Sequence, residues 1–221
     1  MGRLSLRCAV LVIGVSVAAA SGGCSRAEGS TASLPGKELF SACVSCHGAD
    51  GHGNRTIGAP PIAGLPAWYV EAQLAKFRNG MRGTHPDDYE GLRMRPMARQ
   101  MMNEAEVKSV SAYVASLSRA HVSPTLTGGD AKAGATSFAP CVACHGANGQ
   151  GNEALKAPPI AGQADWYLLA QLKKFKAGIR GASSADAQGA LMRPMALSLA
   201  NDQIMLDVVT HVASLPREAT R

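Results

Sequence analysis

Two stretches of the chain carry apolar residues at helical spacing. In the first, Val107, Val110, Val114 and Leu117 follow one another at intervals of three or four residues. The second stretch repeats the pattern with Met205, Val208, Val212 and Leu215. A stripe of this period is typical of an amphipathic helix that buries one face. The sequence therefore predicts two equivalent helices in distant parts of the chain.

These stripes belong to an internal repeat with a displacement of 98 residues. Residues 59–64, Ala-Pro-Pro-Ile-Ala-Gly, return as residues 157–162, and residues 94–98 return as residues 192–196 without any gap. A period this long indicates whole domains, because about 90 residues can enclose a core of their own. We predict an N-terminal domain, a linker and a C-terminal domain at residues 34–118, 119–129 and 130–221.

Each copy has the same predicted order of elements: a short helix, a loop, a middle helix, a loop that contains methionine, and a closing helix. Pro66 suits the start of the first middle helix and Gly80 suits its end. Asp165 and Gly178 occupy the corresponding places in the second copy. The predicted fold class is all-α.

Each copy also contains the pentapeptide C-x-x-C-H, which predicts covalently attached haem c. The residues concerned are Cys43, Cys46 and His47 in the first copy, and Cys141, Cys144 and His145 in the second. A redox-active thiol pair or a zinc site are the alternatives. Neither requires a histidine directly after the second cysteine, and zinc would have to gather two pairs that lie 98 residues apart. We therefore expect two haem c groups, the histidines binding iron, and electron transfer.

The repeat restricts the second iron ligand. His47 and His145 are the only histidines found at equivalent positions of both copies. A thioether sulfur stabilises ferrous iron and is the other common ligand. Two methionines in each copy lie at a suitable distance from the haem motif: Met94 and Met97 in the first, Met192 and Met195 in the second. Spacing alone leaves the choice within each pair open.

The first residues of the chain resemble an export signal. Arg3 and Arg7 precede an apolar run at residues 9–20, which small residues follow. We expect a signal at residues 1–23, a flexible leader at residues 24–33, and a periplasmic protein. Cys24 partly matches a lipidation motif that lacks its usual leucine, so we consider both a lipid anchor that associates with a membrane and an unmodified thiol.

Charge adds little to this picture. The formal charge is +6 for the whole chain and becomes +4 without residues 1–23. Haem propionates would lower it further, so nucleic-acid binding has no support. Two basic clusters could steer a redox partner, although a solvated helix face is the simpler interpretation. They consist of Lys76, Arg78 and Arg82, and of Lys173, Lys174 and Lys176.

The chain resembles cytochrome c4 in four features. These are the two C-x-x-C-H-G motifs, the Pro-Pro-Ile-Ala-Gly segments, the W-Y-x-x-x-Q-L helices and the Met motifs. This family consists of tandem dihaem proteins with two class I cytochrome c domains. The resemblance implies that Met94 and Met192 bind iron, with Met97 and Met195 as second choices. It also implies that a proline carbonyl, from Pro60 or Pro61 in the first copy and Pro158 or Pro159 in the second, contacts the haem histidine.

The expected function is electron transfer without catalysis, with each iron cycling between Fe(III) and Fe(II). The resemblance implies a respiratory donor such as a quinol-oxidising complex and an acceptor such as a terminal oxidase. The alternative is a dihaem subunit of a periplasmic dehydrogenase, of the flavocytochrome c sulfide dehydrogenase or alcohol dehydrogenase type. A peroxidase would need an open iron position, which the matched Met motifs disfavour.

Overall fold

The computed structural model describes residues 34–101, 103–119 and 122–216. The expected export signal, the leader and Cys24 lie outside these ranges. Within them, no helix combines the length and the apolar character that a membrane span requires.

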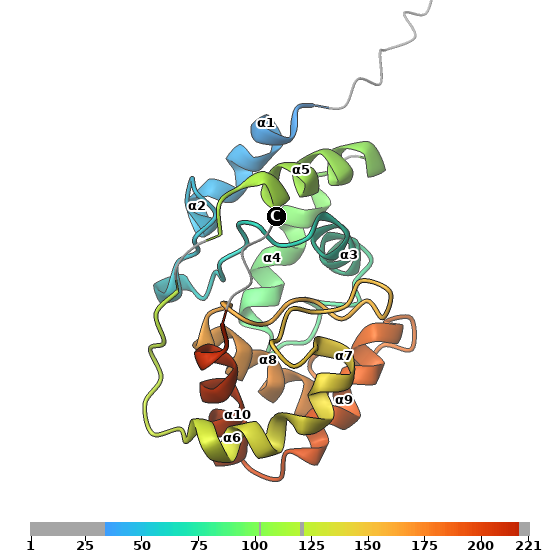
Figure 1. The fold of residues 1–221 in the computed structure, drawn as a ribbon. Coiled ribbons are helices and arrows are strands. Elements are labelled where there is room, and N and C mark those ends of the chain that lie inside the picture. The colour runs from blue at the N-terminus through green and yellow to red at the C-terminus, as the bar shows by residue number, and fades with distance from the viewer. Residues whose placement is uncertain (1–33, 102, 120–121, 217–221) are drawn as a thin grey trace, which may run out of the picture. The chain divides into compact units, whose positions relative to one another are not determined.

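The fold is mostly helical, as predicted, and the same helices occur in both copies (Figure 1). The N-terminal domain contains α1 (Gly36–Phe40), α2 (Val44–His47), α3 (Ala67–Arg78), α4 (Tyr89–Arg99) and α5 (Glu104–Ser116). The C-terminal domain contains α6 (Ala131–Phe138), α7 (Val142–His145), α8 (Asp165–Lys176), α9 (Ala187–Ser198) and α10 (Asp202–Ser214). Short 3-10 helices lie at Ser41–Cys43, Arg55–Ile57 and Ala139–Cys141.

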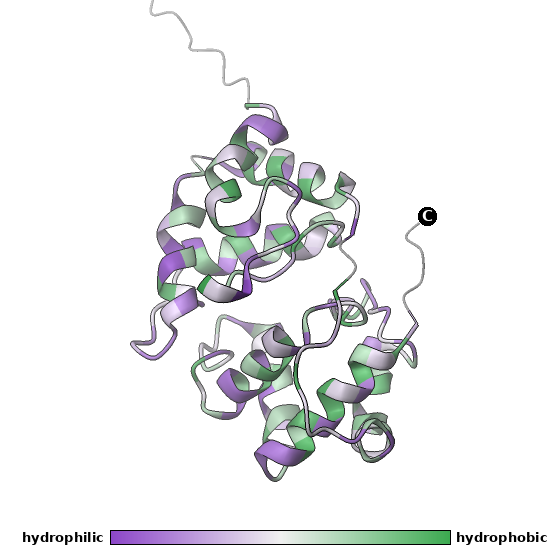
Figure 2. Cartoon of the chain, turned by 90° about the vertical axis from the view of Figure 1, so that its left-hand side faces the viewer, coloured by the Kyte–Doolittle hydropathy of each residue, from purple (hydrophilic) through white to green (hydrophobic). Residues whose placement is uncertain are grey.

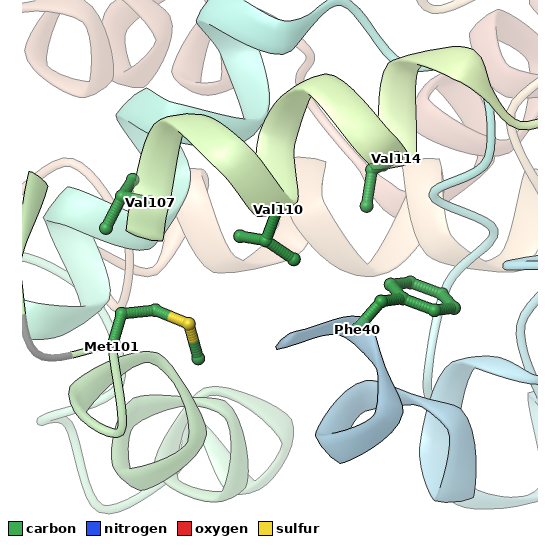
Figure 3. Packing of buried hydrophobic residues seen from close by; sticks show 5 residues of the cluster. All are labelled: Phe40, Met101, Val107, Val110 and Val114. Atoms are coloured by element: carbon green, nitrogen blue, oxygen red, sulfur yellow. The ribbon is translucent and has the colours of Figure 1, made fainter. Parts of the chain in front are cut away.

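The predicted apolar stripes form the two cores. On α5, Val107, Val110 and Val114 face Phe40 and Met101 (Figure 3), and each of the five is nearly inaccessible to solvent. The equivalent cluster in the second domain consists of Phe138, Leu199, Met205, Val208 and Val212. Coloured by hydropathy, the helices show apolar and polar residues alternating along their length (Figure 2), which fits helices that bury one side.

A glycine lets the first helix of each domain approach the closing helix. A Cβ atom at Gly36 would lie 2.1 Å from the Ser109 carbonyl oxygen, and one at Gly134 would lie 1.9 Å from that of Asp207. Any side chain would therefore force α1 away from α5, or α6 away from α10. This crossing holds the start of the C-x-x-C-H segment against the core.

Asp165 begins α8, as the sequence predicts, and it also fastens the linker. Its carboxylate accepts hydrogen bonds from the backbone N–H of Thr125 at 2.5 Å and of Leu126 at 2.6 Å, and from the Thr125 hydroxyl at 2.8 Å. The first copy has Ala67 at this position, so the anchor belongs to the C-terminal domain alone. Both domains lie in one compact unit that spans residues 33–221.

Candidate haem sites and the contacts between them

A single turn of helix arranges the C-x-x-C-H residues in each domain. Cys43 ends a 3-10 turn, and Cys46 and His47 lie in α2, so residues three and four apart share one face. All three line one cavity of the N-terminal domain. Burial, and secondarily the neighbouring Cys46, raises the pKa of the Cys43 thiol to about 11. A reactive redox thiol needs a lowered pKa, so this site does not resemble a thioredoxin-type pair.

The second domain repeats the arrangement with Cys141, Cys144 and His145, which line a second cavity. Burial likewise raises the pKa of Cys141. In the described part of the chain, no group of three or more His, Cys, Asp or Glu side chains could hold a metal ion. The two cysteine pairs therefore do not meet in a zinc site.

A proline carbonyl orients each haem histidine, as the family resemblance implies. His47 Nδ1 lies 2.9 Å from the Pro60 oxygen, and His145 Nδ1 lies 2.9 Å from the Pro158 oxygen. Burial lowers the pKa of both histidines, which keeps the imidazole neutral, and the proline hydrogen bond only partly opposes this. With Nδ1–H donating to proline, Nε2 keeps its lone pair free for iron.

All four candidate methionines line the cavity of their own domain. Their environments differ. Met192 is half-buried, whereas Met195 is exposed. In the first domain the Met97 sulfur lies 3.6 Å from the Gln100 side-chain nitrogen, which can donate to it. Met192 is thus the more buried member of its pair, and in the first pair, where both methionines are half-buried, Gln100 contacts Met97.

These methionines lie in helices, and the predicted loop is wrong. Met94 belongs to α4 and Met192 to α9. Pro96 lies inside α4, where it removes one backbone hydrogen bond, and such a proline usually indicates the end of a helix. The helix nevertheless persists because Asp88 caps its first turn and because α4 packs on α3.

The interpretation of the basic clusters as solvated helix faces is wrong for Lys76 and Arg82 in the first cluster. Lys76 and Arg82 are only 8% and 7% exposed. Arg82 donates from Nη1 to Gln73 Oε1 at 2.7 Å and from Nη2 to Gln171 Oε1 at 3.3 Å, which crosses between the domains. Arg180 forms the reciprocal pair, to Gln171 Oε1 at 2.8 Å and to Gln73 Oε1 at 3.1 Å.

Two buried guanidinium groups therefore share two amide oxygens. Burial and the nearby charge of Arg180 lower the pKa of Arg82. Arg82 lines the first cavity and Arg180 the second, and Arg82 Nε is buried without a hydrogen-bond partner in the described residues. An anionic group would satisfy this nitrogen and offset the two like charges. Haem carries two propionates, so these residues fit that cofactor.

Each cavity is completed by the other domain. Tyr167, Gln171 and Lys174 from α8 line the first cavity together with the N-terminal residues. Trp68, Tyr69 and Lys76 from α3 line the second.

Lys174 and Lys76 also form ion pairs across the interface, with Asp88 and Asp186. Sequence reasoning missed the roles of the glutamines and aspartates. Their recurrence at a displacement of 98 residues was visible, but a repeat compares equivalent positions and does not reveal contacts between the copies.

Comparison with known proteins agrees with this geometry. The family model described as Cytochrome c matches residues 33–118 and 131–216. The thiosulfate dehydrogenase electron acceptor of Stutzerimonas stutzeri (strain A1501) is 35% identical over 70% of this chain and 72% of its own length. Cytochrome c4 of Azotobacter vinelandii is 28% identical over 82% of this chain and 88% of its own.

A solved structure has a similar fold over most of the chain. Reduced recombinant cytochrome c4 from Pseudomonas stutzeri superimposes with a TM-score of 0.65 and 25% identity, and the match covers 82% of this chain and 97% of that one. The chain therefore belongs to the cytochrome c family, in the tandem form of cytochrome c4, and carries two covalently bound haem c groups.

Proposed function

We propose that this protein is an electron carrier with two His/Met-ligated haems, in domains at residues 34–118 and 130–221. Cys43 and Cys46 hold the first haem, and His47 and Met94 bind its iron. Cys141, Cys144, His145 and Met192 are the equivalent residues of the second site. The supporting observation is that His47 and Met94 line one cavity, while His145 and Met192 line the other.

This ligand set determines the chemistry. Haem supplies a reversible one-electron couple, Fe(III)/Fe(II), and a sulfur ligand favours the ferrous state. With histidine and methionine both bound, the iron would have no position open for a substrate. The residues around it act by enclosing the haem, fixing the imidazole through Pro60 or Pro158, and excluding water.

A spectroelectrochemical titration of the holoprotein tests this proposal. We expect two one-electron transitions, and two sulfur-to-iron charge-transfer contributions in the ferric spectrum. A ferric spectrum without those contributions, or rapid binding of peroxide to ferric iron, would contradict His/Met ligation and favour a peroxidase.

The partner is proposed on separate grounds. One relative is named as the electron acceptor of thiosulfate dehydrogenase, which supports a periplasmic dehydrogenase as donor. Another is named as a subunit of a cbb3-type cytochrome c oxidase, which supports delivery to a terminal oxidase. Stopped-flow reduction by a purified dehydrogenase would test the donor, and stopped-flow oxidation by a purified terminal oxidase would test the acceptor. Copurification with a dehydrogenase in fixed stoichiometry would instead favour a permanent subunit.

We also propose export to the periplasm through residues 1–23, with Cys24 as a candidate lipid attachment site. The support is the sequence pattern, together with the tandem cytochrome c4 arrangement. Mass spectrometry of the mature protein distinguishes the two forms. An N-terminus at Cys24 with added acyl mass supports the anchor, and an unmodified mass excludes it.

A further inference from the structure

Two lysines reach reciprocally from one domain into the other. Lys174 of α8 places Nζ 2.6 Å from Asp88 Oδ1 and 2.6 Å from Glu90 Oε2. Lys76 of α3 places Nζ 2.5 Å from Asp186 Oδ1. Lys76 and Lys174 are equivalent in the repeat, and so are Asp88 and Asp186.

The aspartates that receive these lysines cap the helices that carry the candidate methionine ligands. Asp88 Oδ1 accepts the Gly91 N–H of α4 at 3.2 Å, and Asp186 Oδ1 accepts the Gly189 N–H of α9 at 2.9 Å. The oxygen that caps the helix is therefore the same oxygen that binds the lysine. Asp88 and Asp186 are only 3% and 1% exposed, so water cannot easily replace a lost lysine.

The space around each cap is tight. A Cβ atom on Gly91 would lie 2.0 Å from the Asp88 carboxylate, and one on Gly189 would lie 2.3 Å from the Asp186 carboxylate. Each carboxylate therefore occupies the space that a side chain would need at this glycine, and so it packs directly against the first turn of its helix.

The cap is close to the ligand along the helix. Met94 follows Asp88 by six residues, and Met192 follows Asp186 by six. At about 1.5 Å per residue this separation is roughly 9 Å of rigid helix. A shift of the cap therefore moves the methionine with it.

We propose that Lys174 of the C-terminal domain positions Met94 at the N-terminal haem, and that Lys76 of the N-terminal domain positions Met192 at the C-terminal haem. This inference rests on the proposed His/Met ligation and adds that each domain sets the ligation of the other. The two lysines act through the capping aspartates and do not touch iron.

The two lysine contacts between the domains differ in one respect. Lys174 has a second carboxylate, Glu90, whereas the equivalent residue on α9 is the neutral Gln188. The contact to α4 therefore involves two acids and the contact to α9 only one.

The test is Lys174→Met in the holoprotein, which keeps the length of the side chain and removes its charge. We expect the reduction potential of the N-terminal haem to fall, because a displaced sulfur and an unpaired Asp88 both stabilise ferric iron. The charge-transfer contribution of that haem should weaken and its Met94 methyl resonance should shift in the paramagnetic NMR spectrum. The C-terminal haem should keep its potential and its spectrum.

Three further variants distinguish the positioning of the methionine from the simple loss of a lysine charge. Lys173→Met removes an adjacent lysine that pairs with the exposed Asp202 at 2.6 Å, and it should leave both haems unchanged. Lys174→Arg should restore the wild-type signals because it keeps a donor cation. Lys76→Met should reproduce the effects at the C-terminal haem, with the Met192 signals changing instead.

Several results would overturn the inference. Equal shifts at both haems would indicate a general loosening of the interface, and a lower potential with unchanged Met94 signals would indicate charge alone. If Lys174→Met does not fold, Asp88→Asn keeps an oxygen that can cap α4 but removes the charge that holds Lys174, and it should shift the Met94 resonance. No shift in that variant would overturn the inference. A wild-type protein without sulfur-to-iron bands would instead refute His/Met ligation itself.

Discussion

The openings of the two haem cavities differ although the domains share one fold. In the N-terminal domain the opening is polar, with Glu90 at the edge and Arg93 donating to the Ile57 carbonyl at 2.5 Å. This hydrogen bond joins α4 to the loop across the cavity. In the C-terminal domain Leu191 takes the place of Arg93, Leu155 that of Ile57 and Gln188 that of Glu90, and the two leucines are 69% and 51% exposed.

This difference shows how a duplicated protein can keep the same buried haem-binding residues in both copies and change the surface that meets a redox partner. The haem motif, the proline contact and the capping aspartate are identical in both copies. What diverged is the rim, where Leu191 and Gln188 replace the charged Arg93 and Glu90, and Lys156 replaces Gly58. We therefore expect the two haems to respond differently to charged reaction partners.

The largest effect is expected from removing the sulfur ligand in one domain. Met94→Ala should lower the potential of the N-terminal haem by a substantial part of the roughly 0.8 V range that axial ligands span, and leave the other haem unchanged. Met192→Ala should do the reverse. Spectroelectrochemistry with the charge-transfer bands measures both.

Met97→Ala serves as the control, because it removes a methionine from the same helix and cavity. If Met94→Ala retained both charge-transfer contributions while Met97→Ala lost one, the ligand assignment in the N-terminal domain would be wrong.

The next largest effect concerns the two cores. Phe40→Ala and Phe138→Ala each remove a side chain that is 2% exposed, and each should lower the free energy of unfolding of its own domain by about 3–5 kcal/mol. Denaturation followed separately at each haem distinguishes the domains. Identical curves at both haems would show that the two domains unfold as one cooperative unit.

A smaller effect should follow from the linker anchor, which only the C-terminal domain has. Burial opposes ionisation of Asp165, but the hydrogen bonds from Leu126 and Thr125 outweigh it and hold its pKa below the ordinary value. Its stabilising contribution is therefore complete above the unfolded pKa of about 3.9 and is lost as pH falls through the lower folded pKa.

Asp165→Ala should cost about 1.5–3 kcal/mol, the value of one charged hydrogen bond, because water can replace the others at the exposed Thr125. The substitution should also remove the part of the loss of stability at low pH that arises from Asp165. Urea denaturation measured from about pH 3, just below the ordinary carboxyl pKa, to about pH 7 shows both effects. An unchanged acid dependence in the variant would show that other carboxylates account for it.

The smallest effect is expected at the rims themselves. Arg93→Leu makes the N-terminal opening resemble the C-terminal one, so oxidation of that haem by hexacyanoferrate should slow by a few-fold and lose salt dependence. Leu191→Arg should accelerate the C-terminal haem. Arg99→Leu removes the same charge from α4 outside the cavity and should change neither rate by as much. Equal effects of Arg93→Leu and Arg99→Leu would show that the rim has no special role.

Much of this architecture could be predicted from the sequence because the signals are local. The C-x-x-C-H pentapeptides, the valine stripe of α5 and the glycine that ends α3 each act within a few residues. The predicted methionine loop was wrong, because capping by Asp88 and packing on α3 preserve a helix there despite Pro96 in its interior. Lys76 and Lys174 resembled a solvated face, since their acidic partners lie in the other copy and no local pattern connects them.

The shared walls of the two cavities have a consequence for biogenesis. Helix α8 contributes Tyr167 and Lys174 to the first cavity, and α3 contributes Trp68 and Lys76 to the second. If the interface between the domains closed before haem attachment, it would therefore cover part of each cavity. Cys46 and Cys144 remain exposed. We therefore expect maturation to be ordered, with haem attached to each half while the halves are still apart and the interface closing afterwards.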